Sequence, residues 1–119
     1  MNPRLLGRWG EDQAAEYLKR RKYRIIGRNY SCRFGEIDLI AENRDFVVFV
    51  EVKLRKNAGF AAAREYVTAA KRRRLICTAQ HWLASRSTEK QPRFDVVEVY
   101  GTFGHVETVN HIENAFTLS

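Results

Sequence analysis

Acidic and basic side chains of this sequence are spaced along two neighbouring segments in a way that suits phosphodiester chemistry. Asp38 lies within an alternating segment at 35–42, and Glu51 and Lys53 lie two residues apart in the next one. Because successive side chains of a strand leave opposite faces, Glu51 and Lys53 share a face. Crowded carboxylates repel each other and lose hydration, and a hard cation such as Mg²⁺ removes that cost. A lysine beside the ion can orient water and offset charge on a phosphate, so these residues predict a phosphodiester hydrolysis site.

The two segments are expected to pair as a hairpin that turns at Asn43 and Arg44. In that register Asp38 faces Phe49 and lies diagonal to Glu51, at about 7–8 Å between Cβ atoms. A slip of one residue would move Asp38 to the opposite face of the sheet. The alternative interpretation of these charged residues is a ladder of salt bridges on a half-exposed sheet.

Glu11 is a further candidate because it lies on a face of the expected first helix that otherwise carries small or apolar residues. Gly7, Ala14 and Leu18 share this face at helical spacing. A carboxylate is out of place there unless another group pairs with it. The alternative is an exposed helix residue in a weak ion pair.

The elements that must position these residues follow the order helix, three strands, helix, two strands. Asn2 and Pro3 are typical of a helix start, and this helix is expected to end near Arg21. Ile37, Leu39 and Ala41 are expected on one face of the second strand. The remaining ranges are strands at 23–32 (kinked near Gly27), 35–42, 45–53, 94–100 and 105–112, a helix at 68–85, a loop at 54–66 and a polar linker at 86–92.

The chain has 119 residues, of which 45% are hydrophobic, and we expect one domain over 1–119. The longest apolar run, Phe46–Val50, is far shorter than the roughly 20 residues that span a bilayer, and the first ten residues lack the apolar segment of a secretory signal. Cys32 and Cys77 fit neither a disulfide framework nor a zinc site. We therefore expect a cytoplasmic protein with free thiols and no membrane partner.

The net charge is +7, and the excess of basic groups lies before residue 91, which favours a nucleic-acid partner. The alternative for any one basic run is a solvated face. Lys71 is the candidate for a phosphate contact near the site, because Lys71 and Arg72 are expected at the edge of the apolar stripe of the second helix, whereas Arg73 and Arg74 should point outward. The candidate nucleic-acid contacts are Arg20, Arg21, Lys22, Arg55, Lys71, Arg72, Arg73 and Arg74.

Other polar residues of the chain suggest structural roles. Arg93 and Asp95 lie on one expected strand and are taken to support the fold. His81, His105 and His111 have no metal-ligand spacing.

Four short motifs share their order and spacing with one bacterial family. They are Gly10-Glu11 with Ala14, residues 35–40, residues 49–53 and residues 93–97. Together they closely resemble the YraN-type family, which is identified as a member of the PD-(D/E)xK nuclease superfamily, similar to the archaeal Holliday junction resolvases. The resemblance covers residues 4–100, and Ile37 stands where the superfamily's name has proline.

The resemblance implies a restriction-endonuclease-like α/β fold, in which a mixed sheet carries a helix on each face. It implies that Asp38, Glu51 and the Val52 carbonyl bind Mg²⁺, with Mn²⁺ as a possible substitute. Lys53 would serve the attacking water, and Glu11 would complete the site.

The implied activity is a Mg²⁺-dependent endonuclease that hydrolyses DNA phosphodiester bonds, with branched or structured DNA from repair or recombination as the substrate. A homodimer is expected, because cutting two strands needs two sites. The alternative is a non-catalytic nucleic-acid-binding or adaptor module that keeps the fold. A third option is a ribosome- or membrane-associated helper that uses its charge alone.

Overall fold

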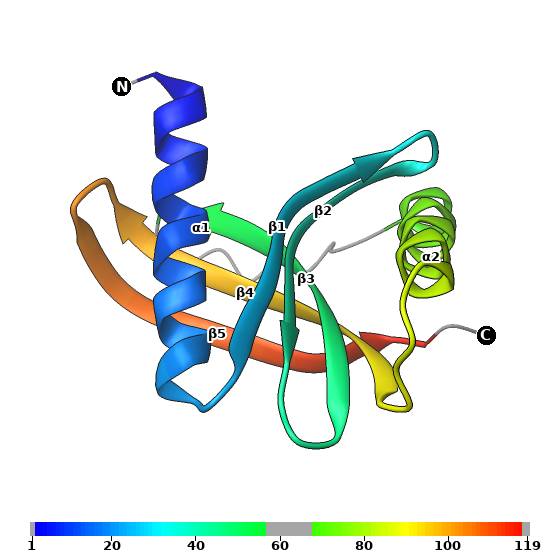
Figure 1. Ribbon diagram of the computed structural model, residues 1–119. Coiled ribbons are helices and arrows are strands. Elements are labelled where there is room, and N and C mark those ends of the chain that lie inside the picture. Colours follow the sequence, from blue (N-terminus) through cyan, green and yellow to red (C-terminus); the bar gives the residue numbers. More distant parts are fainter. Residues whose placement is uncertain (1, 57–67, 118–119) are drawn as a thin grey trace.

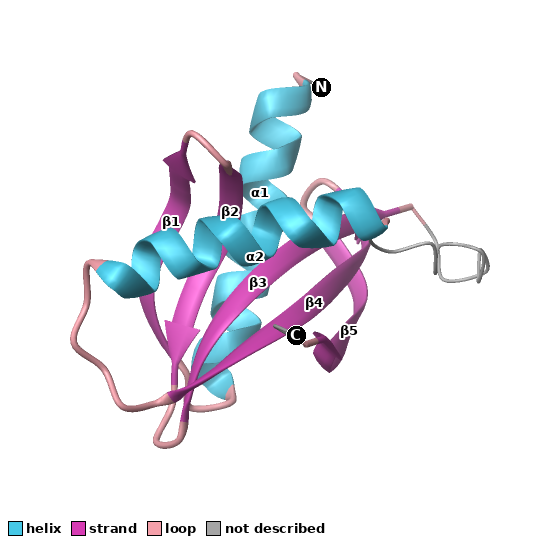
Figure 2. Ribbon diagram, turned by 90° about the vertical axis from the view of Figure 1, so that its right-hand side faces the viewer, coloured by secondary structure: helices cyan, strands magenta, loops and turns pink. Residues whose placement is uncertain are grey.

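Five strands form one mixed sheet with a helix on each face, as Figure 2 shows with α2 in front of the sheet and α1 behind it. The computed structural model describes residues 2–56 and 68–117. Its elements are α1 (Pro3–Arg20), β1 (Arg24–Cys32), β2 (Gly35–Glu42), β3 (Phe46–Arg55), α2 (Ala69–Ala84), β4 (Gln91–Thr102) and β5 (His105–Phe116). This confirms the predicted α/β fold and element order. Neither helix is long and apolar enough to cross a membrane among the residues described.

The strands lie side by side in sequence order, and only β3 and β4 run parallel. A parallel pair needs a crossover connection, which includes α2. β3 continues to Arg55, beyond its predicted end, because it pairs with β4 along its whole length as far as Tyr100. β4 in turn begins at Gln91, inside the predicted linker, where its N–H donates to the Asp45 carbonyl. The rest of the predicted 54–66 loop lies largely outside the described residues.

Both faces of the central strands are buried, since a helix covers each one. Leu39, Ala41, Val48 and Val50 pack with α1, whereas a second cluster packs with α2. Ile37 was predicted to share a face with Leu39 and Ala41, but it packs in the cluster on the α2 side. The reason is that the part of β2 that precedes Leu39 pairs only with β1. Such a two-stranded ribbon twists more strongly than a broad sheet.

The helices begin and pack largely as their sequences predict. The Asn2 side chain accepts from the Arg4 N–H at 2.8 Å, and the buried residues of α1 are Gly10, Ala14, Ala15 and Leu18. A Cβ at Gly10 would come within 3.7 Å of Leu54, so a small residue brings α1 close to β3. The buried stripe therefore runs through Gly10 rather than Gly7, and Glu11 lies at its edge.

Candidate functional site

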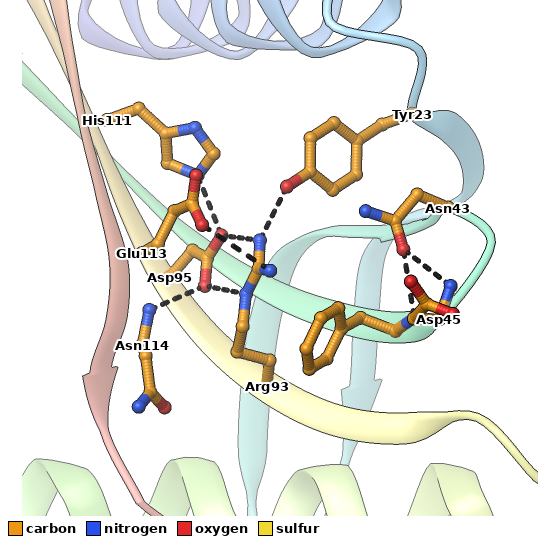
Figure 3. Close-up of polar contacts among 9 residues, drawn as sticks. Tyr23, Asn43, Asp45, Arg93, Asp95, His111, Glu113 and Asn114 are labelled. Carbon is orange, nitrogen blue, oxygen red and sulfur yellow. Dashed lines mark hydrogen bonds and ion pairs between the residues drawn. The ribbon is translucent and has the colours of Figure 1, made fainter.

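The hairpin of β2 and β3 turns one residue later than predicted, which shifts the pairing of the two strands by two residues. The Asn43 N–H donates to the Phe46 carbonyl at 3.1 Å, and the Asn43 Oδ1 accepts from the N–H groups of Asp45 and Phe46 (Figure 3). This turn leaves Arg44 and Asp45 at its centre and pairs Leu39 with Val50. The predicted register, with Asp38 facing Phe49, is therefore wrong. Because the pairing shifts by an even number of residues, Asp38 stays on the face of Glu51.

Asp38 lies where β2 and β3 part, one residue beyond the last pair of their ladder, Leu39 and Val50. Its Oδ2 accepts from the Val52 N–H at 2.8 Å, so a side chain replaces the next main-chain bond. Glu51 follows Val50 and lies beside Asp38, within hydrogen-bonding range of it. The divergence of the strands thus leaves two carboxylates beside each other.

An open cleft of about 290 Å³ lies at this point, between β2, β3 and α2. The first turns of α2 form its opposite wall. Its lining residues are Gly35, Glu36, Asp38, Glu51, Lys71, Arg74 and Leu75.

Two lysines converge on Glu51. The Nζ atoms of Lys53 and Lys71 lie 3.3 Å and 2.5 Å from the Glu51 Oε2. Lys53 comes from the same face of β3, as strand alternation predicts, and Lys71 comes from α2. The Glu51 side chain is only 11% exposed, so these charges meet in a partly desolvated place.

The acid–base properties of the cleft follow from this crowding. Burial and the charge of Glu51 raise the pKa of Asp38 to about 7, against the bond from the Val52 N–H, which lowers it. Burial lowers the pKa of Lys71, but the bond and charge of Glu51 outweigh it, and the pKa is raised. Two adjacent carboxylates therefore resist full ionisation unless positive charge reaches them.

Glu11 lies apart from this pair, near β1. Its Oε1 is 3.8 Å from an Arg28 nitrogen, and its side chain also bonds to Asn29. Burial raises the pKa of Glu11, while these two contacts oppose the rise. Within residues 2–56 and 68–117, no group of three or more His, Cys, Asp or Glu side chains is arranged to hold a metal ion. The structure thus places Glu11 where its charge reaches Asp38, but not in a three-carboxylate centre.

The positions of the basic residues of α2 differ in part from the predicted ones. Lys71 and Arg74 line the cleft, and Arg73 and Arg74 line a neighbouring groove. Arg74 was predicted to point outward, and it is exposed while it lines the cleft. Arg72 was predicted at the apolar edge, but it is exposed and lines neither cavity. The reason is helical spacing: Lys71, Arg74 and Leu75 are three and four residues apart and share one face.

Other predicted contacts lie away from the carboxylates. Arg20, Arg21 and Lys22 are at the C-terminal end of α1, far from the cleft (Figure 1). The Arg21 guanidinium lies over the Tyr17 ring. Arg55, at the end of β3, lies 4.0 Å from Glu98. The structure does not gather these four basic residues around Asp38 and Glu51.

Gly35 is a cleft residue that the sequence interpretation missed. Its φ is +152°, and a Cβ there would come within 3.2 Å of the Thr78 Oγ1 on α2. Glycine is the residue that adopts such a conformation without strain. The signal available in the sequence was a glycine directly after a turn and before the acidic segment.

A second group of charged residues lies on β4 and β5, and it is closed on itself (Figure 3). The Arg93 guanidinium donates two bonds to Asp95, at 2.9 and 2.7 Å, and a third to the Tyr23 hydroxyl. Asp95 also accepts from the Asn114 N–H and bonds to His111 at 2.7 Å. These residues tie β4 to β5 and to the connection between α1 and β1, which is the supporting role predicted for Arg93 and Asp95.

The chain was compared with known families and proteins. A model of the uncharacterised protein family UPF0102 matches residues 10–99. The chain belongs to this family. Among similar UPF0102 proteins, that of Caldanaerobacter subterraneus is 42% identical over 98% of this chain and 98% of its own length. That of Geobacter sulfurreducens is 41% identical over 98% and 91% of the two chains. Membership in UPF0102 supports the resemblance to the YraN-type family.

Proposed function

We propose that this chain is a divalent-metal-dependent endonuclease that hydrolyses DNA phosphodiester bonds in the cleft between β2, β3 and α2. The observation that carries the proposal is the meeting of Asp38 and Glu51 with two lysines at the point where the strands part. An isolated salt-bridge ladder would place opposite charges side by side. Here Glu51 pairs with two lysines, but a second carboxylate, Asp38, also adjoins it at the edge of an open cleft.

The donor set fits Mg²⁺, or Mn²⁺ in its place, because these ions take one or two carboxylates together with water and phosphate oxygens. Asp38 and Glu51 would hold the ion, with the Val52 carbonyl as a further oxygen ligand. When bound, the ion would polarise the phosphate and make bound water more acidic. The Val52 N–H holds the Asp38 carboxylate in place, so one ligand is oriented by the main chain.

The two lysines have separable roles in this proposal. Lys53 shares a strand face with Glu51, so it orients the attacking water beside the carboxylates and offsets negative charge on the phosphate. Lys71 comes from α2, across the cleft, and binds a non-bridging phosphate oxygen of the substrate. Arg74 lines the same wall and adds positive charge.

Structured or branched DNA, of the kind that repair and recombination produce, is the proposed substrate. The net charge of +7 supports binding to the backbone with little sequence readout. Each chain supplies one site, so cutting both strands of a duplex calls for a homodimer.

A cleavage assay tests the proposal. Purified protein is incubated with junction, flap, single-stranded and duplex DNA in Mg²⁺ or Mn²⁺. Lys53→Ala should lower the cleavage rate by about 10²–10³-fold, as expected for loss of a group that stabilises charge developing on the phosphate. Lys19→Ala is the matched control, because Lys19 pairs with Glu16 on the exposed face of α1. Cleavage that survives Lys53→Ala would indicate a contaminant or another site.

A calorimetric titration with Mg²⁺ or Mn²⁺ separates the enzyme from a non-catalytic binding module. Wild-type protein should bind the ion, and Asp38→Asn should not. DNA binding with no ion binding by the wild type, or with equal ion binding by both proteins, would favour the binding module.

A further inference from the structure

A second groove continues from the cleft along α2. It has a volume of about 250 Å³ and is lined by Phe34, Ala70, Arg73, Arg74 and Cys77. Arg74 lines both cavities, so they are neighbours on one surface. Figure 1 shows the turn between β1 and β2, which carries Phe34, bending over α2. Gly35 permits this approach, because a side chain there would press on Thr78.

Positive charge and an aromatic ring meet in this groove. The Arg33 guanidinium lies 4.9 Å from the centre of the Phe34 ring, and the His81 ring packs against Phe34 at 6.1 Å. Within the part of the chain that the structure describes, no carboxylate lies within ion-pair distance of Arg33, Arg73 or Arg74. Arg73 and Arg74 in the groove lining, and Arg33 over the Phe34 ring beside it, are thus available to an anionic ligand that also offers a flat surface.

We propose that this groove holds a single-stranded stretch of DNA next to the cleaved bond, with an unpaired base stacked on Phe34 and phosphates on Arg73 and Arg74. The inference rests on the proposed nuclease function and defines its substrate further. Arginines bind phosphates, and a base of any type stacks on an aromatic ring. A blunt duplex keeps its bases stacked inside the helix, so it would offer Phe34 no base face. The substrate class is therefore DNA with an unpaired segment beside the cleaved phosphodiester.

The position of Arg74 links the groove to the chemistry. This arginine lies between Phe34 and the pair Asp38 and Glu51, since it lines both cavities. A strand whose phosphate contacts Arg74 can place the adjoining phosphate in the cleft. An apolar protein segment in the groove would instead cover the arginines without supplying negative charge, which is costly.

Fluorescence anisotropy with labelled oligonucleotides in EDTA tests this inference without cleavage. The probes are a single strand, a duplex with a single-stranded overhang and a blunt duplex. Phe34→Ala should weaken binding of the first two probes about tenfold, the loss expected for one stacked base, and leave blunt-duplex binding nearly unchanged. Phe34→Trp should restore binding, because the larger ring also stacks.

Phe103→Ala is the matched control, because Phe103 is a 52%-exposed aromatic residue in the turn between β4 and β5. It should bind all three probes like the wild type. The inference is overturned if Phe34→Ala binds like the wild type, if it weakens all three probes equally, or if Phe103→Ala causes the same loss. Thermal unfolding of Phe34→Trp checks that the hairpin stays folded.

The outcomes also separate this inference from the proposed nuclease. Selective loss of single-strand binding in Phe34→Ala, in a protein that cleaves no DNA, would keep the groove and reject the nuclease. Metal-dependent cleavage with no effect of Phe34→Ala on any probe would keep the nuclease and reject the groove.

Discussion

Asp38 and Asp95 occupy neighbouring regions of the same sheet, yet their surroundings act on them in opposite directions. Asp38 is half-buried, and its pKa is raised to about 7, first by burial and then by Glu51. Asp95 has a fully buried side chain, and burial alone would raise its pKa. Bonds from His111, Arg93 and the Asn114 N–H outweigh that effect, and its pKa is lowered.

The difference teaches that burial does not by itself mark a functional carboxylate. Asp95 has charged and main-chain partners on both oxygens, so its network is complete and serves the fold. Asp38 has one main-chain donor and a like-charged neighbour. A carboxylate that lies in an open cleft and has too few hydrogen-bond donors or positive charges beside it is suited to bind a cation.

The largest effect is expected from breaking the closed network. Asp95→Asn would leave the buried Arg93 guanidinium without its buried charge partner, with only the exposed Glu113 as an ion-pair partner, and the loss of a buried partner costs about 3–5 kcal/mol of unfolding free energy. Urea denaturation measures it. Asp12→Asn is the control, since Asp12 forms an exposed pair with Arg28 worth about 1 kcal/mol or less. A loss in Asp95→Asn no greater than in Asp12→Asn would contradict the structural role.

Asp38→Asn should have the opposite effect on stability at high pH. Because the pKa of Asp38 is about 7 in the folded protein and about 3.9 in an unfolded chain, the folded state holds the extra proton between these values. The contribution of Asp38 to the unfolding free energy therefore falls as the pH rises from about 4 to 7. Asp38→Asn removes this loss, so at pH 8 in EDTA the variant should be about 1–3 kcal/mol more stable than the wild type.

The advantage of Asp38→Asn should become small near pH 4, where the wild-type carboxyl is protonated in the folded state and about half protonated in the unfolded state. Asp95 contributes with the other sign, because its lowered pKa gives stability that is lost as the pH falls. Denaturation curves at several pH values would show whether the two carboxylates differ in this way. If Asp38→Asn is less stable than the wild type by the same amount at pH 4 and at pH 8, charge repulsion at Asp38 is ruled out.

Divalent ions should stabilise only those proteins in which Asp38 is intact. At ten times its dissociation constant, Mg²⁺ or Mn²⁺ should add about 1.4 kcal/mol to the unfolding free energy of the wild type. Asp38→Asn should show no such gain, whereas Glu16→Gln, a change in an exposed pair on α1, should show all of it. Equal stabilisation of all three proteins would place the ion elsewhere.

Glu11→Gln is expected to have the smallest effect. It removes a partly exposed contact with Arg28, so the unfolding free energy should change by about 0.5 kcal/mol or less. Since the charge of Glu11 contributes to the raised pKa of Asp38, the pH range over which stability falls should move slightly lower. Loss of Mg²⁺-dependent stabilisation in Glu11→Gln would instead make Glu11 a metal ligand.

Much of the local structure could be predicted because local rules decide it. Asn2 and Pro3 mark the start of α1, and the bounds of β2 were predicted to the residue. The hairpin register was predicted wrongly, because the side chain of Asn43 bonds within the turn and moves its centre. Even so, the even shift kept Asp38 on the face of Glu51 and Lys53.

Strand alternation by itself determined that Glu51 and Lys53 share one face of the sheet, and the residue types determined that basic residues gather at the start of α2. Only the tertiary structure decided that β2 and β3 part at Asp38, that Lys71 and Arg74 turn into the cleft, and that Asp95 is compensated while Asp38 is not. The physical reason is range. Alternation and helical spacing act over a few residues, whereas desolvation and charge pairing depend on which distant segments the fold packs together.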